Sequence, residues 1–397
     1  MIGRIKELRR TRDLRKQDLT PSVLDFGPVR IHVARHFGFC YGVENAIEIS
    51  YRAIDENPDK RVFLLSQMIH NPQVNQDLQD RGITFIMDTD GKQFMPWEDL
   101  KSDDVVIIPA FGTTLAIEQR LSAIGVDIQR YNTTCPFVEK VWNRSQKLGQ
   151  ENHTVIIHGK PKHEETRATF SHSSAAAPSI VVEDMEESKV LGEFIAGSRP
   201  LSEFESAFAG RTSPGFDPQK DLQRVGVVNQ TTMLASDTQA IADHFKQVMT
   251  ARYGADRLPE HFADTRDTLC YATNDNQDAT HSLMKVPAHL AIVVGGYNSS
   301  NTSHLVELCE QRFPTYFIHS ESEMLSKSEI RHFDLHHKKT IVTSSWIPDA
   351  APLEVALTSG ASCPDALVDR VIETFTGYFP EARTMADAVD LFEQRYS

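Results

Sequence analysis

The stretch Gly38-Phe39-Cys40-Tyr41-Gly42-Val43 joins a strand-like run at residues 29–34 to a helical pattern that begins near Val43. Its two glycines allow the backbone to approach a bulky group closely. The N-terminus of the following helix favours the thiolate form of Cys40. A buried, unreactive cysteine in an ordinary strand-to-helix turn would give the same local pattern. Two similar sites further along the chain favour the reactive interpretation.

Cys135 and Cys270 also lie where a loop leads into a helical pattern, and Pro136 suits the first helical position. Three such cysteines, each in a separate α/β block, could converge on one metal centre. A structural zinc site would usually need a fourth protein ligand and closely spaced cysteine pairs, and neither CxxC nor HExxH occurs. A [4Fe–4S] cluster is bound by cysteine thiolates, and three of them would leave one iron open to a substrate.

The composition is that of an ordinary globular protein, because 40% of the 397 residues are hydrophobic and 24% are charged. No apolar run is long enough to cross a membrane, and residues 1–16 lack the apolar core of a secretory signal. The net charge of −14 argues against nucleic acid as the main partner. Five cysteines without a signal peptide favour a reducing compartment, so we expect a cytoplasmic protein, in the bacterial cytosol rather than a plastid stroma.

Strand-like and helical segments alternate from Val29 onward, which predicts an α/β fold with mostly parallel sheets. Strands are expected at 29–34, 61–65, 83–86, 105–108, 127–131, 155–157, 225–228, 290–295 and 340–344, and those at 61–65, 83–86, 105–108 and 290–295 have the apolar pattern of buried strands. Residues 1–28 form a basic arm, for which a helix packed at a domain edge is expected. Residues 171–222 are rich in small, polar and acidic residues with weak periodicity, which predicts a partly irregular insertion. Helices are expected at 364–376 and 384–395.

Histidine, hydroxyl and amide side chains gather where the predicted strands end. Such groups bind phosphate well at helix N-termini, and a neighbouring carboxylate could relay a proton. Taken singly, the hydroxyl residues could equally be helix caps, and His163 could be a surface histidine. Cys309 lies in an apolar helical pattern and is expected in the core, whereas Cys363 adjoins a polar loop. The segments are His70-Asn71, His163 with Glu165, Thr231-Thr232, Ser299-Ser300-Asn301 and Ser362.

Taken in order, eight segments between about residues 30 and 375 resemble the LytB/IspH family of 4-hydroxy-3-methylbut-2-enyl diphosphate reductases. Each motif is short, but the ordered set is specific. The segments are Gly-Phe-Cys-Tyr-Gly-Val at 38–43, Gln-Met-Ile-His-Asn at 67–71, Thr-Thr-Cys-Pro-Phe-Val at 133–138, Lys-His-Glu-Glu at 162–165, Asn-Gln-Thr-Thr at 229–232, Leu-Cys-Tyr-Ala-Thr at 269–273, Asn-Ser-Ser-Asn at 298–301 and Gly-Ala-Ser-Cys-Pro-Asp at 360–365.

The resemblance implies three α/β domains in a pseudo-threefold trefoil around a central iron–sulfur cluster. The expected divisions are a basic arm at 1–28, domains at 29–134, 135–269 and 270–375, and a helical tail at 376–397. The family's [4Fe–4S] cluster would be held by Cys40, Cys135 and Cys270. Glu165 and Thr231 would deliver protons. The diphosphate would be bound by His70, His163, Thr232, Ser299, Ser300, Asn301 and Ser362.

The family reaction removes the allylic hydroxyl of the substrate as water, using two electrons and two protons, and yields isopentenyl and dimethylallyl diphosphate. It is the last step of the methylerythritol phosphate route to isoprenoids. No flavin or nicotinamide fingerprint is visible, so the resemblance implies an external donor such as ferredoxin or flavodoxin. The basic arm, with Arg9, Arg10, Arg12, Arg15 and Lys16, is a hypothetical docking surface for that donor.

One departure from the family pattern falls within the shared motifs. Many members carry Ala-His-Gly where this chain has Ala110-Phe111-Gly112, so one expected diphosphate donor is replaced by a phenyl ring. Two other functions share much of the pattern. A non-redox [4Fe–4S] hydro-lyase would turn over without a reductant. An iron–sulfur or zinc sensor, or a structural module, would bind no diphosphate and would tolerate Glu165→Gln.

Overall fold

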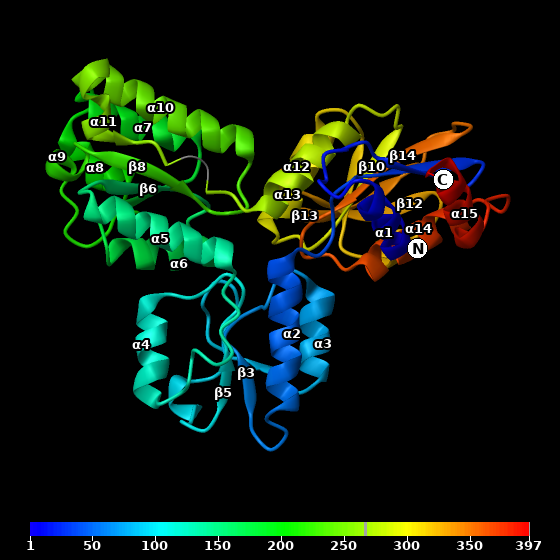
Figure 1. Ribbon diagram of the computed structural model, residues 1–397, viewed down its shortest axis with the longest axis horizontal. Helices are drawn as coiled ribbons and strands as arrows, with labels where there is room; N and C mark the ends of the chain where they lie inside the picture. The colour runs from blue at the N-terminus through cyan, green and yellow to red at the C-terminus, as the bar shows by residue number, and fades with distance from the viewer. Residues whose placement is uncertain (266–267, 397) are drawn as a thin grey trace. The chain divides into compact units, whose positions relative to one another are not determined.

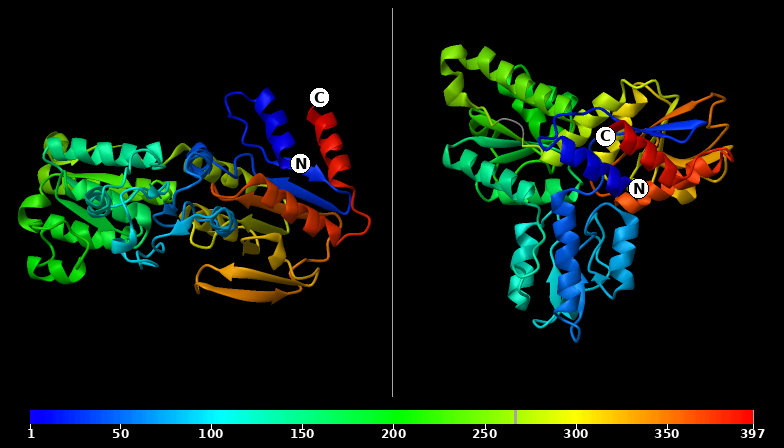
Figure 2. Two further views of the ribbon diagram at one scale, coloured as in Figure 1. Left: turned by 90° about the horizontal axis from the view of Figure 1, so that it is seen from below. Right: turned by 45° about the vertical axis from the view of Figure 1, so that its right-hand side comes forward.

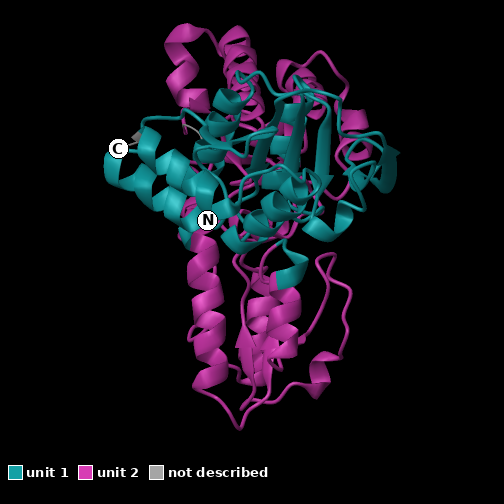
Figure 3. Ribbon diagram, turned by 90° about the vertical axis from the view of Figure 1, so that its right-hand side faces the viewer, with its two compact units in different colours: residues 1–41, 70–73, 271–397 teal, residues 42–69, 74–270 magenta. Residues whose placement is uncertain are grey.

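The computed structural model describes residues 1–265 and 268–396, and these form two compact units. Unit 1 contains residues 1–41, 70–73 and 271–397, and unit 2 contains residues 42–69 and 74–270 (Figure 3). Each unit has its own parallel β-sheets with helices packed against them (Figure 1). The α/β class predicted from the sequence is therefore confirmed.

Unit 1 is built on a five-stranded sheet in the order β1-β2-β14-β10-β11. The pair β1–β2 is antiparallel, and the other neighbours are parallel. The central strands are buried throughout, as expected for a parallel sheet covered by helices. The strands are β1 (Ser22–Asp25), β2 (Val29–Val33), β10 (Leu290–Val294), β11 (Thr315–Ile318) and β14 (Leu353–Ser359), and a separate hairpin is formed by β12 (Glu329–Asp334) and β13 (Lys339–Ser344).

The helices of unit 1 include the N-terminal arm. Helix α1 (Ile2–Arg12) packs on the unit by burying Ile2 and Ile5, which agrees with the helix expected in the arm, whereas residues 22–25 of the predicted arm form strand β1 of the main sheet. Helix α1 lies beside the C-terminal helix α15 (Met385–Tyr396), so the two ends of the chain are neighbours (Figure 2). The other helices of this unit are α12 (Tyr271–Leu283), α13 (Ser300–Glu310) and α14 (Asp365–Gly377).

Unit 2 contains two parallel sheets. The first has the order β4-β3-β5 and the second has the order β7-β6-β8-β9. The strands are β3 (Val62–Leu64), β4 (Thr84–Phe85), β5 (Val105–Ile107), β6 (Thr154–His158), β7 (Ser179–Val182), β8 (Val225–Asn229) and β9 (Phe262–Ala263). The main helices are α2 (Tyr41–Asp55), α3 (Pro72–Asp80), which begins within unit 1, α4 (Leu115–Ile124), α5 (Pro136–Gln150), α6 (Glu164–Ser174), α7 (Met185–Ala196) and α10 (Ala235–Tyr253).

In unit 1, the strand predicted at 29–34 is β2, which pairs with β14 near the C-terminus. The strand predicted at 340–344 is β13 in the β12–β13 hairpin, while the central strand β14 was not predicted. The charged Glu354 interrupts the apolar pattern of β14, but its carboxylate is 2.7 Å from Nε2 of His32 on β2. His32 on the neighbouring strand therefore stabilises the charge of Glu354, which would be unfavourable in an apolar strand without such a partner.

In unit 2, one predicted strand is absent and one expected insertion is more regular than its sequence pattern indicates. Residues 171–222, expected to be partly irregular, contain the buried strand β7 and the regular helix α7. Asp184 caps α7 by accepting a hydrogen bond from the backbone N–H of Glu187. Residues 127–131 do not form a strand, and only an isolated bridge joins Ile108 to Asn132. The domain limits and the trefoil arrangement stay predictions.

Candidate active site

The carboxylate of Glu165 is held at the start of α6, directly after β6. His163 is the N-cap of this helix, and its Nδ1 accepts a hydrogen bond of 3.2 Å from the backbone N–H of Glu165. Since Nδ1 accepts, a neutral His163 carries its proton on Nε2. Glu165 is only 1% exposed, and its two carboxylate oxygens accept hydrogen bonds from Thr231, at 2.5 Å from the backbone N–H and 3.1 Å from the hydroxyl.

Burial raises the pKa of Glu165 to about 7, and the two hydrogen bonds from Thr231 offset only part of that effect. Burial disfavours the charged carboxylate, so the group keeps its proton up to neutral pH. A carboxylic acid with such a pKa is suited to general acid catalysis near pH 7.

The loop after β8 links Glu165 to Cys270. The backbone N–H of Cys270 donates to the carbonyl of Thr231 at 3.1 Å. The buried side chain of Gln230 fixes this loop by accepting from the backbone N–H of Lys160 and the hydroxyl of Thr166. Its amide also donates to the hydroxyl of Thr232 at 2.7 Å. The sequence analysis assigned Gln230 no role, because an uncharged side chain within the motif at 229–232 does not by itself indicate a function.

The three predicted ligand cysteines each stand immediately before a helix and are partly exposed. Cys40 precedes α2, Cys135 is the N-cap of α5, and Cys270 precedes α12. The backbone N–H of Cys135 donates to the carbonyl of Ala110 at 2.9 Å, and that of Cys40 donates to the carbonyl of Ala361 at 3.3 Å. The positive end of a helix dipole stabilises a thiolate, the form that binds metals.

Cys309 and Cys363 differ from these three, because both are fully buried in the core of unit 1. Burial raises the pKa of each thiol to about 12, so both stay neutral at physiological pH. The prediction that Cys309 is a core residue is confirmed. Within residues 1–265 and 268–396, no three His, Cys, Asp or Glu side chains are grouped as they would be around a metal ion. Convergence of the three ligand cysteines therefore stays a prediction.

Unit 1 brings most of the predicted phosphate-binding residues to the N-terminus of α13. Ser299 caps this helix by accepting from the backbone N–H of Thr302 at 3.2 Å. Asn301 is buried, and its Oδ1 accepts from the backbone N–H of Ala361 at 3.0 Å. Its Nδ2 is buried as well and has no hydrogen-bond partner among the described residues. A buried amide donor at the positive end of a helix is well placed for an anion.

His70, Asn71 and Ser362 approach one another in the same unit. The hydroxyl of Ser362 donates to the carbonyl of His70 at 3.2 Å, and Nδ2 of Asn71 donates to the carbonyl of Ser362 at 2.8 Å. Gly296, just before the α13 motif, also packs here, because a Cβ at that position would lie 2.2 Å from the His70 carbonyl. Unit 1 thus brings together three motifs that are far apart in the sequence.

Phe111, the departure from the usual histidine, packs edge-on against the ring of His163 with the centroids 5.6 Å apart. The contact orients the imidazole at the start of α6. The phenyl ring cannot donate a hydrogen bond, but it supports a neighbouring ring that can.

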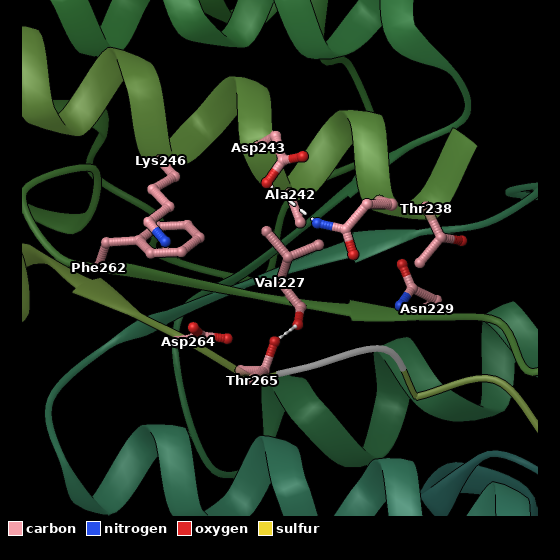
Figure 4. A pocket seen from close by; sticks show the side chains of 10 residues that line it. Val227, Asn229, Thr238, Ala242, Asp243, Lys246, Phe262, Asp264 and Thr265 are labelled. Atoms are coloured by element: carbon pink, nitrogen blue, oxygen red, sulfur yellow. Dashed lines mark hydrogen bonds between the residues drawn. The ribbon is translucent and has the colours of Figure 1, made fainter. Parts of the chain in front are cut away.

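A small cavity behind the Asn229–Thr232 loop is unsuited to the substrate. It lies between β8 and α10 and has a volume of about 80 Å³ (Figure 4). Val227, Thr238, Asp243 and Lys246 are among its walls. An anion of diphosphate size would need more room and would face the carboxylate of Asp243.

The described parts form an α/β protein with a buried carboxyl group of raised pKa, a cluster of polar side chains at the N-terminus of α13, and three cysteines that each precede a helix. The sequence model of the LytB protein family matches residues 31–376, and the chain belongs to that family. A protein of Thermosynechococcus vestitus, named 4-hydroxy-3-methylbut-2-enyl diphosphate reductase, is 42% identical over 347 residues, covering 87% of this chain and 84% of its own. A protein of the same name from a Synechococcus strain is 41% identical over 351 residues, covering 88% and 86%.

Two solved structures of proteins with this reductase activity share the fold. One has a TM-score of 0.53 at 24% identity and covers 87% of this chain and 99% of its own. The other, from Plasmodium falciparum, has a TM-score of 0.61 at 20% identity and covers 92% and 99%. The family resemblance seen in the sequence is therefore confirmed. None of the helices in the described ranges is both long and apolar enough to span a membrane.

Proposed function

We propose that this chain catalyses the reductive dehydroxylation of 4-hydroxy-3-methylbut-2-enyl diphosphate to isopentenyl and dimethylallyl diphosphate. Membership of the LytB family and the names of its relatives support this assignment. The observation that carries it is Glu165, a buried acid with a pKa of about 7, linked through Thr231 to Cys270. Loss of the hydroxyl as water needs a proton at that oxygen, and Glu165 is suited to supply it.

The donor set fits the [4Fe–4S] cluster that the family implies. Cys40, Cys135 and Cys270 are the partly exposed cysteines, and each stands directly before a helix, whereas the other two cysteines are buried. Thiolates are the ligands that such clusters use. We assign these three as ligands. When bound, the cluster would supply the two electrons and a Lewis acid at an open iron.

The chain's own residues would bind the substrate and move protons. The N-terminus of α13, with Ser299, Ser300 and Asn301, would hold the diphosphate, and His70, His163, Thr232 and Ser362 are further candidates. Binding the remote diphosphate supplies energy for positioning the allylic end. Thr231, whose hydroxyl contacts the Glu165 carboxylate, would orient the acid and pass the proton on.

Anaerobic turnover of the substrate tests the proposal. The protein is reconstituted with iron and sulfide and incubated with and without reduced methyl viologen, and both the loss of substrate and the formation of the two diphosphate products are measured. Formation of these products only with reductant supports the reductase. Loss of substrate without reductant, and without these products, would support a hydro-lyase, and no turnover by fully loaded protein would support a sensor or structural role.

Asn301→Asp is expected to raise the KM for the diphosphate by about 10- to 150-fold, because a hydrogen bond to a charged group is worth roughly 1.5–3 kcal/mol. The variant keeps the oxygen that accepts from Ala361 but loses the buried Nδ2 donor. Ser303→Ala is the control, since its hydroxyl donates to the carbonyl of Ser299. A KM equal to that of wild type would exclude Asn301 from the anion site.

The electron source and the compartment follow from the same proposal. The reaction needs two electrons, and we propose that a ferredoxin or flavodoxin delivers them. We also propose the bacterial cytosol as the compartment, because thiolate ligands persist in reducing surroundings and the relatives from Thermosynechococcus vestitus and Synechococcus are bacterial proteins.

A further inference from the structure

A basic cavity of about 200 Å³ lies beside Cys40 in unit 1. Its walls come from the N-terminal arm, from residues 35–40 and from the first turn of α12. The described wall contains one carboxylate, that of Asp275. The basic side chains are Lys6, Arg10, Lys16 and Arg35.

Arg35 adds a largely buried positive charge to the wall of this cavity. The residue is 7% exposed, and the carboxylate of Asp13 is 3.7 Å from its Nη2, which is too long for a strong hydrogen bond. Together with Lys6, Arg10 and Lys16, this charge favours an anionic side chain at the cavity.

The surroundings of the cavity have the character of a protein-docking surface. Tyr41 is 59% exposed, and its backbone N–H donates to the hydroxyl of Tyr271, which lines the cavity. Leu14 is 82% exposed in the arm segment between Asp13 and Lys16. Exposed aromatic residues among cations are typical of interface centres. We call Arg10, Leu14, Lys16, Arg35 and Tyr41 the Cys40 surface.

The charge of the arm points to an acidic partner. Residues 1–41 contain nine basic and four acidic residues, a surplus of five positive charges, although the whole chain carries −14. Carboxylates elsewhere in unit 1 pair with part of this charge, as Glu393 does with Arg4 and Asp365 with Lys6. The surplus is therefore concentrated at residues 10–16, where four basic residues accompany one acidic residue, and this stretch attracts an acidic protein. Such local complementarity steers association and fixes orientation.

We propose that the Cys40 surface docks a small acidic one-electron carrier protein of the ferredoxin type, with one of its carboxylates entering the cavity beside Arg35. The proposal rests on the proposed function, in which Cys40 is a cluster ligand. Docking there brings the carrier's redox centre close to that ligand. Two reduced carriers, each oxidised by one electron, would supply the two electrons of one turnover.

The structure also changes the choice of docking residues within the arm. Arg9 is 2% exposed and pairs with Asp18, so it does not belong to the surface. Ile2 and Ile5 are core residues, so deleting residues 2–16 would disturb the unit itself. Point variants are therefore the suitable test, and Arg10 and Lys16 are both exposed.

The test compares Arg10→Glu/Lys16→Glu with wild type on the complete, cluster-loaded protein. Binding of an oxidised plant-type [2Fe–2S] ferredoxin is titrated by calorimetry between low and high salt, and turnover is measured with reduced ferredoxin and with reduced methyl viologen. The matched control is Lys189→Glu/Lys220→Glu, which makes the same charge change at two exposed lysines with i,i+3 acidic partners in unit 2. Arg10 has the same kind of partner in Glu7.

We expect the double variant to bind ferredoxin at least tenfold more weakly at low salt, with a flatter salt dependence and unchanged viologen turnover. Leu14→Ala should weaken binding severalfold at all salt concentrations. Unchanged ferredoxin binding in the double variant, or equal weakening in the control, would overturn the docking proposal. Absence of viologen turnover in wild type would instead overturn the proposed function, and the binding titration would still decide whether this surface docks the carrier.

Discussion

Glu165→Gln lowers turnover with reduced methyl viologen by a factor of about 10²–10⁴, the usual contribution of a positioned general acid. The variant keeps the size of the side chain and an oxygen that can accept from the backbone N–H of Thr231. It removes the proton that the buried carboxylic acid would give to the leaving hydroxyl. The loss should fall on kcat, while the KM for the diphosphate changes little.

The pH dependence gives a second readout for the same residue. The wild-type rate should fall as the pH rises through about 7, because the acid then loses its proton. The residual rate of Glu165→Gln should not follow that titration. A variant with wild-type kcat, or with the same pH profile, would remove Glu165 from the reaction.

Stability should change in the same pH window. The pKa of Glu165 is raised in the folded state, so between about 4.5 and 7 the folded protein holds a proton that the unfolded chain has lost. The free energy of unfolding therefore decreases as the pH rises through this range and levels off above it. Denaturant unfolding at pH 5 and pH 8 should show a larger decrease for wild type than for Glu165→Gln.

Cys40→Ser, Cys135→Ser and Cys270→Ser are each expected to lose the cluster and to lower turnover by more than about a thousandfold. A serine hydroxyl does not ionise near neutral pH and is a poor replacement for a thiolate ligand. The measurements are bound iron and sulfide per chain, the visible absorption of the reconstituted protein, and anaerobic turnover.

Cys309→Ser is the matched control, because this thiol lies in the core of unit 1 and burial raises its pKa to about 12. It should keep full iron content and lose only stability, by about 1–3 kcal/mol for a buried hydroxyl. If Cys309→Ser bleached the protein as fully as Cys135→Ser, the ligand assignment would be wrong.

Local sequence was sufficient for the fold class and for many of the helices and strands, and it singled out candidate site residues whose roles stay predictions. The apolar runs at 155–157 and 290–295 are strands β6 and β10, and the helices after Pro136 and near 364 and 384 are where their patterns placed them. Glu165 and Thr231 were singled out by motifs that are 66 residues apart, and their side chains are in contact. Such motifs can be recognised in the sequence because helix caps, tight turns and strand ends each require particular residue types at fixed positions.

Other features depend on partners that are distant in the chain. The sheet membership of β2 and the existence of β14 rest on their mutual hydrogen bonds and on the His32–Glu354 contact. The burial that raises the pKa of Glu165 and the basic cavity beside Cys40 are likewise products of packing. The sequence alone determined which groups are available for chemistry, since that follows from residue type. Tertiary structure decided their protonation and their accessibility, because burial and electrostatic energies depend on neighbours in space.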